Sequence, residues 1–567
     1  MKKIVFFIFS SLLVLRPICA DAPLDYKVSI VGGGIVGALE SYYTYKEAQK
    51  EGEKASVIVY EKGKSLSSSS TGQSSTNTSY NIVPSLTIDE ILSVVPRGAE
   101  LSKKLEIPFD QPGGIRVDDV PGSNDSESAI HFKESVTIYG SDKNHDDRTL
   151  SLLTLGRKSM DLWQELYDEA DAELKTILDT SYFNPCHEPK NASKKVLRDG
   201  YRIDLIYGIP NVLKRALNMK TDYEKLGYKN CTVLSPDEAI SIDPALSDFC
   251  QDHSEIDPRG VRVWKNDSVA LWRPGGCIDM HVFLPKFYAY LKKVMGQYRD
   301  ADGQMRDCFE LRFGSEVTGV EFDRDTENLR IIGLKFSNGA HQFESHIDSR
   351  YVFCPGESVG TLQKLGFQEP AFAAFAGPAL FITIPLSPDQ IKLYRQFSHC
   401  MEVHSEGIIL SWQARFKEDT IFIGVGGTKA FYGDKQPNTD EAFAKNRNLL
   451  QLNMINDVLP EFISLACGYE THGKTLSAEE LALLEAKGIA RRWVGRRAVA
   501  YDGFPTIGPL YQNNQRVRNA RCTTHLGSGG VSFGPGAIFI SRSSDQSNQS
   551  DFVQKILMYA DSRRSAK

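Results

Sequence analysis

The hydrophobic pattern predicts a β-α-β unit near the start of the chain. Residues 26–31, YKVSIV, form a short apolar run with the length of a buried strand. A stretch of helical length follows at about 35–50, and residues 56–60 form a second apolar strand that ends in Glu61. Strands that alternate with helices are typical of an α/β protein with a parallel sheet. Further along, apolar and polar residues alternate over 316–339, which predicts a β-meander.

An earlier apolar run, at residues 4–15, has a different meaning. It follows two lysines and precedes the small residues Ala20 and Ala22. This order is typical of a signal peptide, here residues 1–20, and predicts an exported protein, periplasmic or secreted. The run is short for a bilayer span, so an uncleaved N-terminal membrane anchor, with peripheral membrane contact, is the alternative.

The composition is that of a globular protein and excludes several functional classes. The chain has 567 residues, of which 41% are hydrophobic and 24% are charged, so two to four domains of ordinary size are expected. The formal net charge of -6 does not provide the basic surface that nucleic-acid binding requires. The ten cysteines are scattered without a CxxC pair, and the sequence therefore predicts no metal site.

A glycine-rich turn directly follows the first predicted strand. Gly32, Gly34 and Gly37 form a G-x-G-x-x-G motif that encloses Ile35 and Val36. In such a motif the first glycine permits a tight turn and the second lets the backbone approach a pyrophosphate. The third glycine lets the following helix pack closely on the strand, and the helix N-terminus then binds the phosphate charge.

An acidic residue at the end of the second predicted strand completes this pattern. Glu61, which Lys62 follows, would accept hydrogen bonds from ribose hydroxyls. This favours FAD or NAD over NADP, because the 2′-hydroxyl must then be free of phosphate. Strand, glycine turn, helix and acid together predict a dinucleotide-binding site and not a turn without a ligand.

The residues around this motif resemble one enzyme family. The segments GGGIVG at 32–37, VIVYEK at 57–62 and TGQSSTN at 71–77 resemble the N-terminal third of the FAD-dependent oxidoreductases of the D-amino-acid oxidase family. In that family the small, hydroxyl-rich loop that follows the second strand contacts the flavin nucleotide. The resemblance therefore favours FAD over NAD.

The resemblance continues at the other end of the chain. WVGRR at 493–497 and DGFPTIGP at 502–509 resemble the W-x-G-x-R and D-G-x-P-x-I-G-P segments of the family. The glycine-rich loop at 527–536 resembles the final loop that closes on the flavin. Two residues depart from the family pattern, since Ala498 stands where proline is frequent and His525 where glycine is usual.

The resemblance implies an α/β fold with two parts, both discontinuous in sequence. An FAD-binding Rossmann-like domain would carry the G-x-G-x-x-G motif, and a second α+β substrate domain would be built on a mixed or antiparallel sheet. The FAD-binding domain is expected at 24–96, 231–365 and 494–555, and the substrate domain at 97–230 and 366–493. Residues 118–200 and 434–490 are interpreted as insertions.

The resemblance also implies which residues contact the cofactor. The cofactor-binding residues would be Gly32, Gly34, Ile35, Val36, Gly37, Glu61, Lys62, Thr71, Gly72, Ser74, Ser75, Asn77, Gly356, Gly527, Gly529, Gly530 and Val531. The N–H groups of the helix that follows the final loop would stabilise negative charge on the flavin. Some relatives attach the flavin through a His or a Cys, but 71–77 contains no His and 495–508 no Cys. Non-covalent FAD is therefore predicted.

Two residues are candidates for the catalytic site. The resemblance gives Arg497, in the arginine position of W-x-G-x-R, the role of binding a substrate carboxylate. A guanidinium suits that role because its planar fork makes two parallel hydrogen bonds to a carboxylate. Trp412, on a predicted strand, would form a wall of the substrate pocket, and ordinary core packing is the alternative. His404 and His525 are titratable candidates for which packing or surface positions are the simpler interpretation.

These residues favour an FAD-dependent oxidoreductase that oxidises a carbon–nitrogen bond of an amino acid or related amine by hydride transfer to the flavin. The expected partners are a small carboxylate-bearing amine and an electron acceptor, either oxygen or a quinone. One alternative is a dehydrogenase for a 2-hydroxy acid or a glycerol-phosphate-like substrate. Another is a secreted binding protein that retains the flavoprotein scaffold.

Overall fold

The computed structural model describes most of the chain. The described residues are 24–66, 134, 145–183, 201–208, 211–323, 329–343, 348–356, 360–394, 402–403, 409–415, 418–427, 430–433, 441–527 and 529–564. The predicted signal peptide, the hydroxyl-rich loop with Thr71, Gly72, Ser74, Ser75 and Asn77, and His404 lie outside the described residues.

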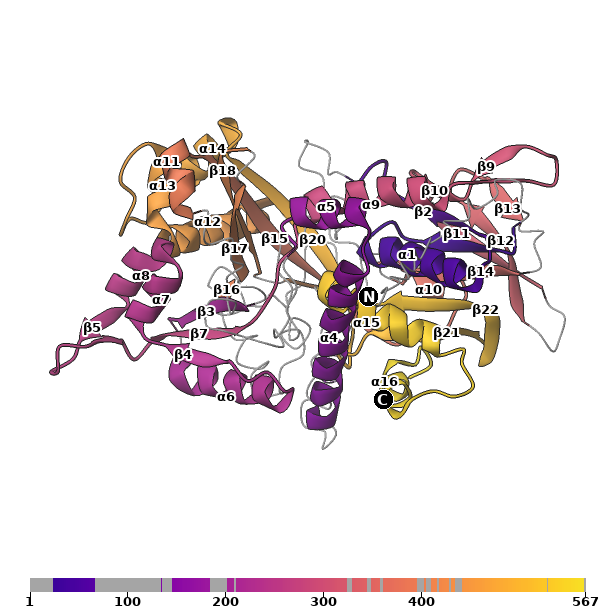
Figure 1. The fold of residues 1–567 in the computed structure, drawn as a ribbon, viewed down its shortest axis with the longest axis horizontal. Coiled ribbons are helices and arrows are strands. Elements are labelled where there is room, and N and C mark those ends of the chain that lie inside the picture. The colour runs from indigo at the N-terminus through magenta and orange to yellow at the C-terminus, as the bar shows by residue number, and fades with distance from the viewer. Residues whose placement is uncertain are drawn as a thin grey trace, which may run out of the picture.

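A six-stranded sheet forms the centre of one half of the molecule (Figure 1). Its order is β10 (Phe309–Arg312), β2 (Ala55–Tyr60), β1 (Tyr26–Val31), β14 (Ser349–Phe353), β22 (Gln515–Thr524) and β21 (Thr506–Gln512). The strands from β10 to β22 run parallel, and β21 returns antiparallel to β22. Val31, the last residue of β1, pairs with Tyr60 and with Phe353. The glycine motif therefore begins at the carboxyl edge of the sheet, between the ends of β2 and β14.

Helices cover one face of this sheet, and a smaller sheet covers the other. Val28 and Ile30 pack in one cluster with α1 (Ile35–Glu51) and α9 (Met280–Met295). Val31 packs on the opposite side in a cluster with β11 (Val317–Asp323) and β12 (Arg330–Phe336). With β13 (His341–Phe343), these strands form an antiparallel β11-β12-β13 sheet at the position of the predicted meander. Helix α15 (Gly530–Ser543) packs on α1, and α4 (His145–Asp168) packs on α15.

An antiparallel sheet forms the second half of the molecule. The strands β17 (Ile409–Arg415), β18 (Thr420–Gly426), β15 (Phe372–Pro385) and β19 (Ala430–Gly433) lie in this order, and β20 (Ala490–Ala500) pairs with β15. One face is covered by α12 (Glu441–Val458), α13 (Pro460–Cys467) and α14 (Ala478–Ala486). Figure 1 shows these helices at the end of the molecule farthest from α1.

A mixed four-stranded sheet shares a hydrophobic core with the antiparallel one. Its order is β16 (Glu402–Val403), β3 (Tyr201–Tyr207), β7 (Ser268–Pro274) and β4 (Thr232–Leu234). The sequence-based boundaries assign β4 and β7 to the FAD-binding part, but both strands pair within this sheet. Conversely α4, expected in the substrate part, packs on α15. Strand pairing places β4 and β7, and helix packing places α4; both depend on contacts between segments that are distant in the sequence.

The remaining elements are short and lie around these sheets. They are α5 (Ala172–Thr180), α6 (Val212–Lys225), α7 (Pro236–Ile242), a 3-10 helix (Pro244–Leu246), α8 (Ser247–Asp252), α10 (Thr361–Lys364), α11 (Pro388–Tyr394), α16 (Asp551–Ala560), β5 (Ser254–Ile256), β6 (Arg262–Trp264), β8 (Gln297–Arg299) and β9 (Met305–Asp307).

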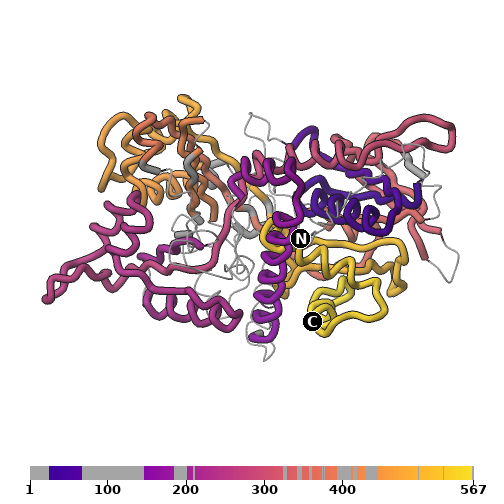
Figure 2. Tube along the Cα trace, viewed as in Figure 1, coloured from indigo at the N-terminus to yellow at the C-terminus, as the bar shows by residue number. Residues whose placement is uncertain are grey.

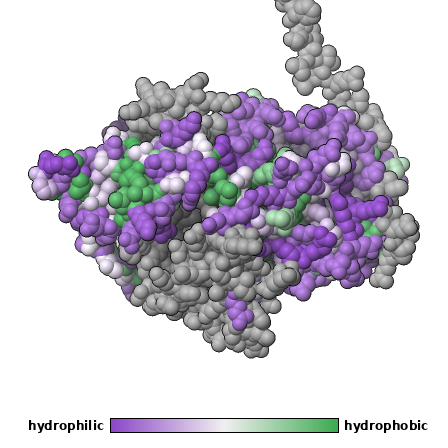
Figure 3. Space-filling view, turned by 90° about the horizontal axis from the view of Figure 1, so that it is seen from below, coloured by the Kyte–Doolittle hydropathy of each residue, from purple (hydrophilic) through white to green (hydrophobic). Residues whose placement is uncertain are grey.

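The arrangement confirms the predicted fold class, an α/β sheet with a separate antiparallel sheet. Figure 2 shows the first and last of the described segments side by side in the same half, as the β1-β14-β22 order requires. Within the described residues, no helix is long and apolar enough to cross a membrane. The face in Figure 3 is largely hydrophilic where it is coloured, with apolar side chains in small separate patches.

Candidate functional site

The glycine motif lies where three parallel strands end. Gly32 follows β1 with a φ of 115°, and a Cβ atom there would lie 2.0 Å from the carbonyl oxygen of Cys354. Gly37 is equally confined, because its Cβ would lie 2.1 Å from the carbonyl oxygen of Gly32. The turn therefore has room for glycine alone at both positions, which brings the N-terminus of α1 against the sheet edge.

Glu61 lies against this turn from the end of β2. Its side chain is buried, with Oε2 accepting a hydrogen bond from the Gly33 N–H at 2.9 Å and Oε1 from the Gly63 N–H at 2.7 Å. A carboxylate has about four lone-pair positions, so these two bonds fix the group and leave it able to accept from further donors. Lys62, next to it, is half-buried.

The N-terminal turns of two helices lie close together at the glycine motif. Helix α1 begins at Ile35 after Gly34, and α15 begins at Gly530 after Gly529. A glycine has no side chain to cap a helix, so the first-turn N–H groups of both helices face outward from uncapped ends. The helices cross near these ends, since a Cβ at Gly534 would lie 3.7 Å from side-chain carbons of Val36 and Leu39. Two positive helix ends thus point to one region.

Two aromatic residues support this region, and the sequence motifs did not indicate either of them. Tyr288 of α9 donates a hydrogen bond from its hydroxyl to the Gly34 carbonyl oxygen at 3.4 Å. Burial, with the nearby Glu61, raises the Tyr288 pKa well above its usual value, so the hydroxyl stays protonated. Trp163 of α4 is fully buried and donates from Nε1 to the Val531 carbonyl oxygen at 3.0 Å.

Two further predicted cofactor residues lie close by. Gly356, with a φ of 56°, forms the turn two residues after Cys354. Gly527, with a φ of 60°, donates its N–H to the Ala498 carbonyl oxygen at 3.1 Å. This bond joins the last glycine-rich loop to strand β20, and it connects the two halves of the molecule directly beside Arg497.

Arg497 lies on the face of the antiparallel sheet that the α12–α14 helices leave uncovered. On β20, Trp493 packs with an aromatic cluster on that face, and the space above Gly495 is filled by the Trp493 ring. Arg497 is two residues further and therefore shares the face. Its guanidinium crosses over Gly377, where a Cβ would lie 2.5 Å from Nη1. Arg497 is half-buried.

Trp412 lies on the opposite face. Through Ile423 of β18 it is aligned with Ile382 of β15, whereas Arg497 is aligned with Phe375. Phe375 and Ile382 differ by an odd number of positions along β15, so their side chains point to opposite faces. Trp412 is 2% exposed and belongs to the cluster that packs under α12. This position corresponds to core packing and does not bring Trp412 next to Arg497.

His525 takes part in buried packing at the base of the last loop. Its Nδ1 lies 2.8 Å from Thr506 Oγ1 and its Nε2 lies 3.0 Å from Glu369 Oε1. The ring stacks on Phe372 with centroids 5.5 Å apart. The φ of His525 is 57°, in the left-handed region that favours glycine. The contacts of the ring stabilise a histidine at this position.

The assembled groups fit a dinucleotide with a flavin. The uncapped N-termini of α1 and α15 would bind the pyrophosphate and the flavin edge, and Glu61 would accept from the ribose. Arg497 directly precedes Ala498, whose carbonyl oxygen accepts from the Gly527 N–H, so β20 brings its backbone beside the last glycine-rich loop. In the described part of the chain, no group of three His, Cys, Asp or Glu side chains could hold a metal ion.

Comparison with known proteins agrees with this interpretation. The family model described as DAO, FAD dependent oxidoreductase, matches residues 27–540. Among solved structures, a modified fructosyl peptide oxidase from Aspergillus nidulans superposes with a TM-score of 0.52 at 11% identity, covering 96% of this chain and 94% of that chain. The L-proline dehydrogenase from P. horikoshii has a TM-score of 0.50 at 15% identity, covering 96% and 98%. At these identities the two structures share the fold alone. Among curated proteins, none matches the sequence.

Proposed function

Because the chain belongs to the DAO family of FAD-dependent oxidoreductases, we propose that it oxidises a carbon–nitrogen bond of an amino acid or a related carboxylate-bearing amine. The observation that carries the proposal is the position of Arg497. β20 presents this cation beside the final glycine loop, on the face of the substrate sheet opposite α12–α14. A half-buried guanidinium there fits a substrate carboxylate.

The protein's own contribution is to bind and orient. FAD, when bound, supplies the redox chemistry by accepting a hydride from the substrate carbon, and the substrate leaves as an imine. Arg497 would hold the carboxylate with two parallel hydrogen bonds and so fix the distance between the reacting carbon and the flavin. The N-terminus of α15 would stabilise negative charge on the reduced ring. Tyr288, protonated and buried, supports the turn at Gly34.

The related structures are consistent with such a substrate. One of the similar structures is named an L-proline dehydrogenase, and proline carries both an amine and a carboxylate. We extend this combination to the present chain because Arg497 offers the matching carboxylate contact. Trp412 has no place in this scheme, since it packs under α12.

A flavin-bleaching assay tests the proposal. The purified yellow protein is mixed anaerobically with a panel of L- and D-amino acids, N-substituted amino acids, amines without a carboxylate, and 2-hydroxy acids. Bleaching by carboxylate-bearing amines, followed by release of ammonia or an amine, is the expected result. Bleaching by 2-hydroxy acids alone would replace this function with that of a hydroxy-acid dehydrogenase, and bleaching by no compound would favour the binding-protein alternative. Reoxidation by air or by a quinone then identifies the acceptor.

We further propose that the FAD is held without a covalent bond and that the protein is exported. Both proposals depend on sequence segments alone, namely the absence of a His in 71–77 and the signal-peptide pattern of 1–20. Acid precipitation should release all of the flavin into the supernatant, and flavin retained in the pellet would contradict non-covalent binding. The N-terminus of the mature protein should begin after Ala20, and an intact Met1 in a membrane fraction would indicate an anchor.

A further inference from the structure

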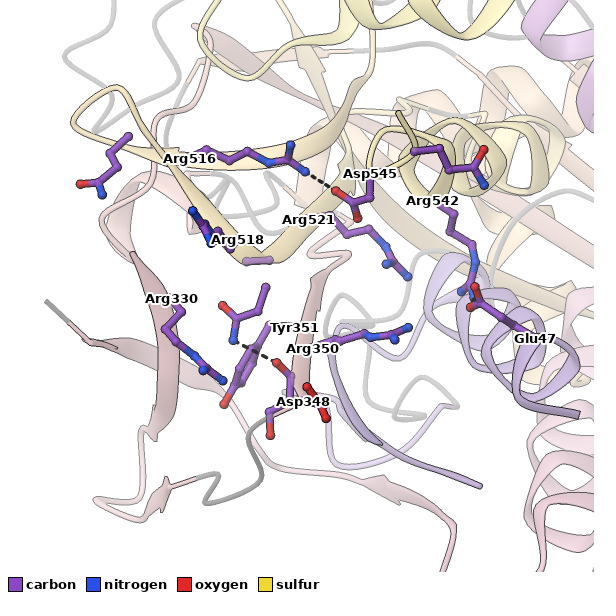
Figure 4. Close-up of a pocket in the computed structure, with 15 residues that line it drawn as sticks. Glu47, Arg330, Asp348, Arg350, Tyr351, Arg516, Arg518, Arg521, Arg542 and Asp545 are labelled. Atoms are coloured by element: carbon purple, nitrogen blue, oxygen red, sulfur yellow. Dashed lines mark hydrogen bonds and ion pairs between the residues drawn. The ribbon is translucent and has the colours of Figure 1, made fainter. Parts of the chain in front are cut away.

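A cavity lies at the end of the six-stranded sheet that is distant from the glycine motif. Its volume is about 1010 Å³, and it is lined by residues of β12, β14, β22 and α15 (Figure 4). The amino end of β14, at Ser349 and Arg350, forms part of its wall, whereas Cys354 beside Gly32 follows the carboxyl end. At ~3.3 Å per residue, the two ends of β14 are roughly 13 Å apart. The cavity is therefore separate from the proposed cofactor site.

Arginine dominates the lining of this cavity, which we name the arginine pocket. Its six arginines are Arg330, Arg350, Arg516, Arg518, Arg521 and Arg542. Three carboxylates, Glu47, Asp348 and Asp545, accompany them. The chain as a whole is acidic, with 66 Lys and Arg against 72 Asp and Glu, so this concentration of guanidinium groups is a local feature and not a reflection of composition.

The carboxylates hold particular arginines in place. Asp545 pairs with Arg516, and Glu47 pairs with Arg542. Below the pocket, Glu40 is 1% exposed, pairs with Arg521 and lies 3.4 Å from Arg542. These pairs position three of the guanidinium groups, and with Glu40 included the pocket still has six arginines against four carboxylates.

Hydrogen bonds also hold the wall of the pocket that β12, β14 and β22 form. The Asn519 side chain donates to the carbonyl oxygens of Ile331 and Ser349, both at 2.9 Å, and accepts from the Ile331 N–H at 2.8 Å. It therefore ties β22 to β12 and β14 at the base of the pocket. The Arg350 guanidinium lies over the Tyr26 ring, 4.2 Å from its centre. In this contact the charge of the guanidinium is attracted to the face of the ring, and the contact does not occupy the N–H donors of Arg350.

We propose that the arginine pocket is a second ligand site, which binds a compact anion that carries phosphate groups. Arginine forks match phosphate oxygens in geometry, and several of them converging from different walls match the charge of a polyphosphate better than that of a single carboxylate. The volume is that of a small-molecule site. Figure 4 shows that the arginine side chains come from several walls of the same pocket, on β12, β14, β22 and α15.

The test uses the full-length, FAD-loaded protein and inorganic pyrophosphate as the probe. With FAD in place, the pyrophosphate site of the glycine motif is occupied and does not compete. Calorimetric titration at low ionic strength should show one bound pyrophosphate. The double variant Arg350→Ala/Arg518→Ala removes two exposed pocket arginines that are not needed for the Glu40, Glu47 and Asp545 pairs. Its Kd should rise at least ~10-fold, because each lost charge-assisted bond is worth about that factor.

A matched control removes the same charge elsewhere. Arg259 and Arg299 are exposed and lie outside the pocket, so Arg259→Ala/Arg299→Ala should leave the pyrophosphate Kd within a factor of two. The flavin absorbance of both double variants reports that each is folded. Equal weakening of pyrophosphate binding in the two double variants would show general charge attraction and would overturn the proposal.

A second arm distinguishes a free ligand from a membrane lipid. The protein is sedimented with phosphatidylcholine vesicles that contain phosphatidic acid, and with vesicles of phosphatidylcholine alone. Binding of pyrophosphate would indicate a soluble ligand. Binding only to the vesicles with phosphatidic acid would indicate a lipid headgroup, provided that Arg350→Ala/Arg518→Ala abolishes it. Both results support a phosphate site. Binding of neither probe, or binding that the double variant retains, would contradict it.

Discussion

Arg497 is the residue on which the proposed chemistry depends. Arg497→Ala should leave the flavin spectrum unchanged while kcat/KM for the substrate falls roughly 30- to several-thousand-fold, because losing a buried charged pair costs about 2–5 kcal/mol. Arg497→Lys should recover only part of the activity, since an ammonium group cannot make the two parallel bonds. Stopped-flow reduction of the flavin measures both variants.

The control for Arg497 lies on the same strand. Arg492 differs from it by an odd number of positions, so it faces the other side of the sheet, where it pairs with Glu485. Arg492→Ala should keep nearly full activity. If Arg492→Ala abolishes oxidation and Arg497→Ala does not, the substrate lies on the helix-covered face and the proposed site is wrong.

Gly32 offers a second residue-level prediction, this time for the cofactor. Gly32→Ala should weaken FAD binding by at least ~10-fold, because the new Cβ would meet the Cys354 carbonyl oxygen at 2.0 Å in a backbone with a φ of 115°. Gly52→Ala is the matched control. Gly52 also has a positive φ of 71° but has nothing within 4 Å of the added carbon. It should lose about 1 kcal/mol of stability and keep the FAD affinity, measured by flavin fluorescence.

Asp243 links stability to pH. The residue is fully buried, and burial raises its pKa to about 7, although its carboxylate accepts a hydrogen bond from the Ala245 N–H at 3.0 Å. The folded pKa of Asp243 lies above the unfolded value of 3.8. The contribution of Asp243 to stability is therefore fully present below pH 3.8, and it is lost as the pH rises through the folded pKa of about 7. Asp243→Asn should therefore raise Tm more at pH 8 than at pH 5. An equal change at both values would exclude titration of Asp243.

At the scale of elements, one buried carboxylate connects three of them. Glu40 of α1 pairs with Arg521 of β22 and Arg542 of α15. Burial alone would raise the Glu40 pKa, but the two guanidinium groups outweigh it and hold the pKa below its usual value. The stabilisation is thus present above the unfolded value of 4.5 and is lost as pH falls through the folded pKa.

Glu40→Gln tests this connection. It should destabilise the protein at pH 7 by roughly 3 kcal/mol, because two arginines lose their buried partner. The difference from the parent should shrink as the pH is lowered, as thermal unfolding would show. Glu47→Gln, which removes a 40% exposed partner of Arg542, should cost less than ~1 kcal/mol. A larger effect from Glu47 than from Glu40 would contradict the assigned roles.

The elements also show how far the sequence determines the site. The turn at Gly32, the helix that follows and Glu61 were predictable, since their chemistry lies within one contiguous β-α-β unit. The opposed faces of Trp412 and Arg497 were not, because they depend on how β17, β18, β15 and β20 align across the sheet. Tyr288 and Trp163 reach the site through helix packing, which leaves no local sequence signal.

At the scale of the whole molecule, the cofactor region is assembled from both ends of the chain. Strand β14 separates β1 from β22, and α15 supplies the second helix N-terminus. A chain that ends after residue 489 should therefore bind no FAD, although it retains the entire glycine motif. A chain that lacks only 565–567 should bind FAD like the parent. Yellow colour in the shorter chain after size exclusion would show that the N-terminal unit suffices.

The same arrangement carries a consequence for how the protein is made. A ribosome releases the G-x-G-x-x-G motif long before β22 and α15. Until then, the half-built sheet ends at an open strand with neither its neighbour nor the second helix in place. We therefore expect a chain interrupted before β22 to stay colourless. Acquisition of flavin would then report that both distant segments of the cofactor region are in place.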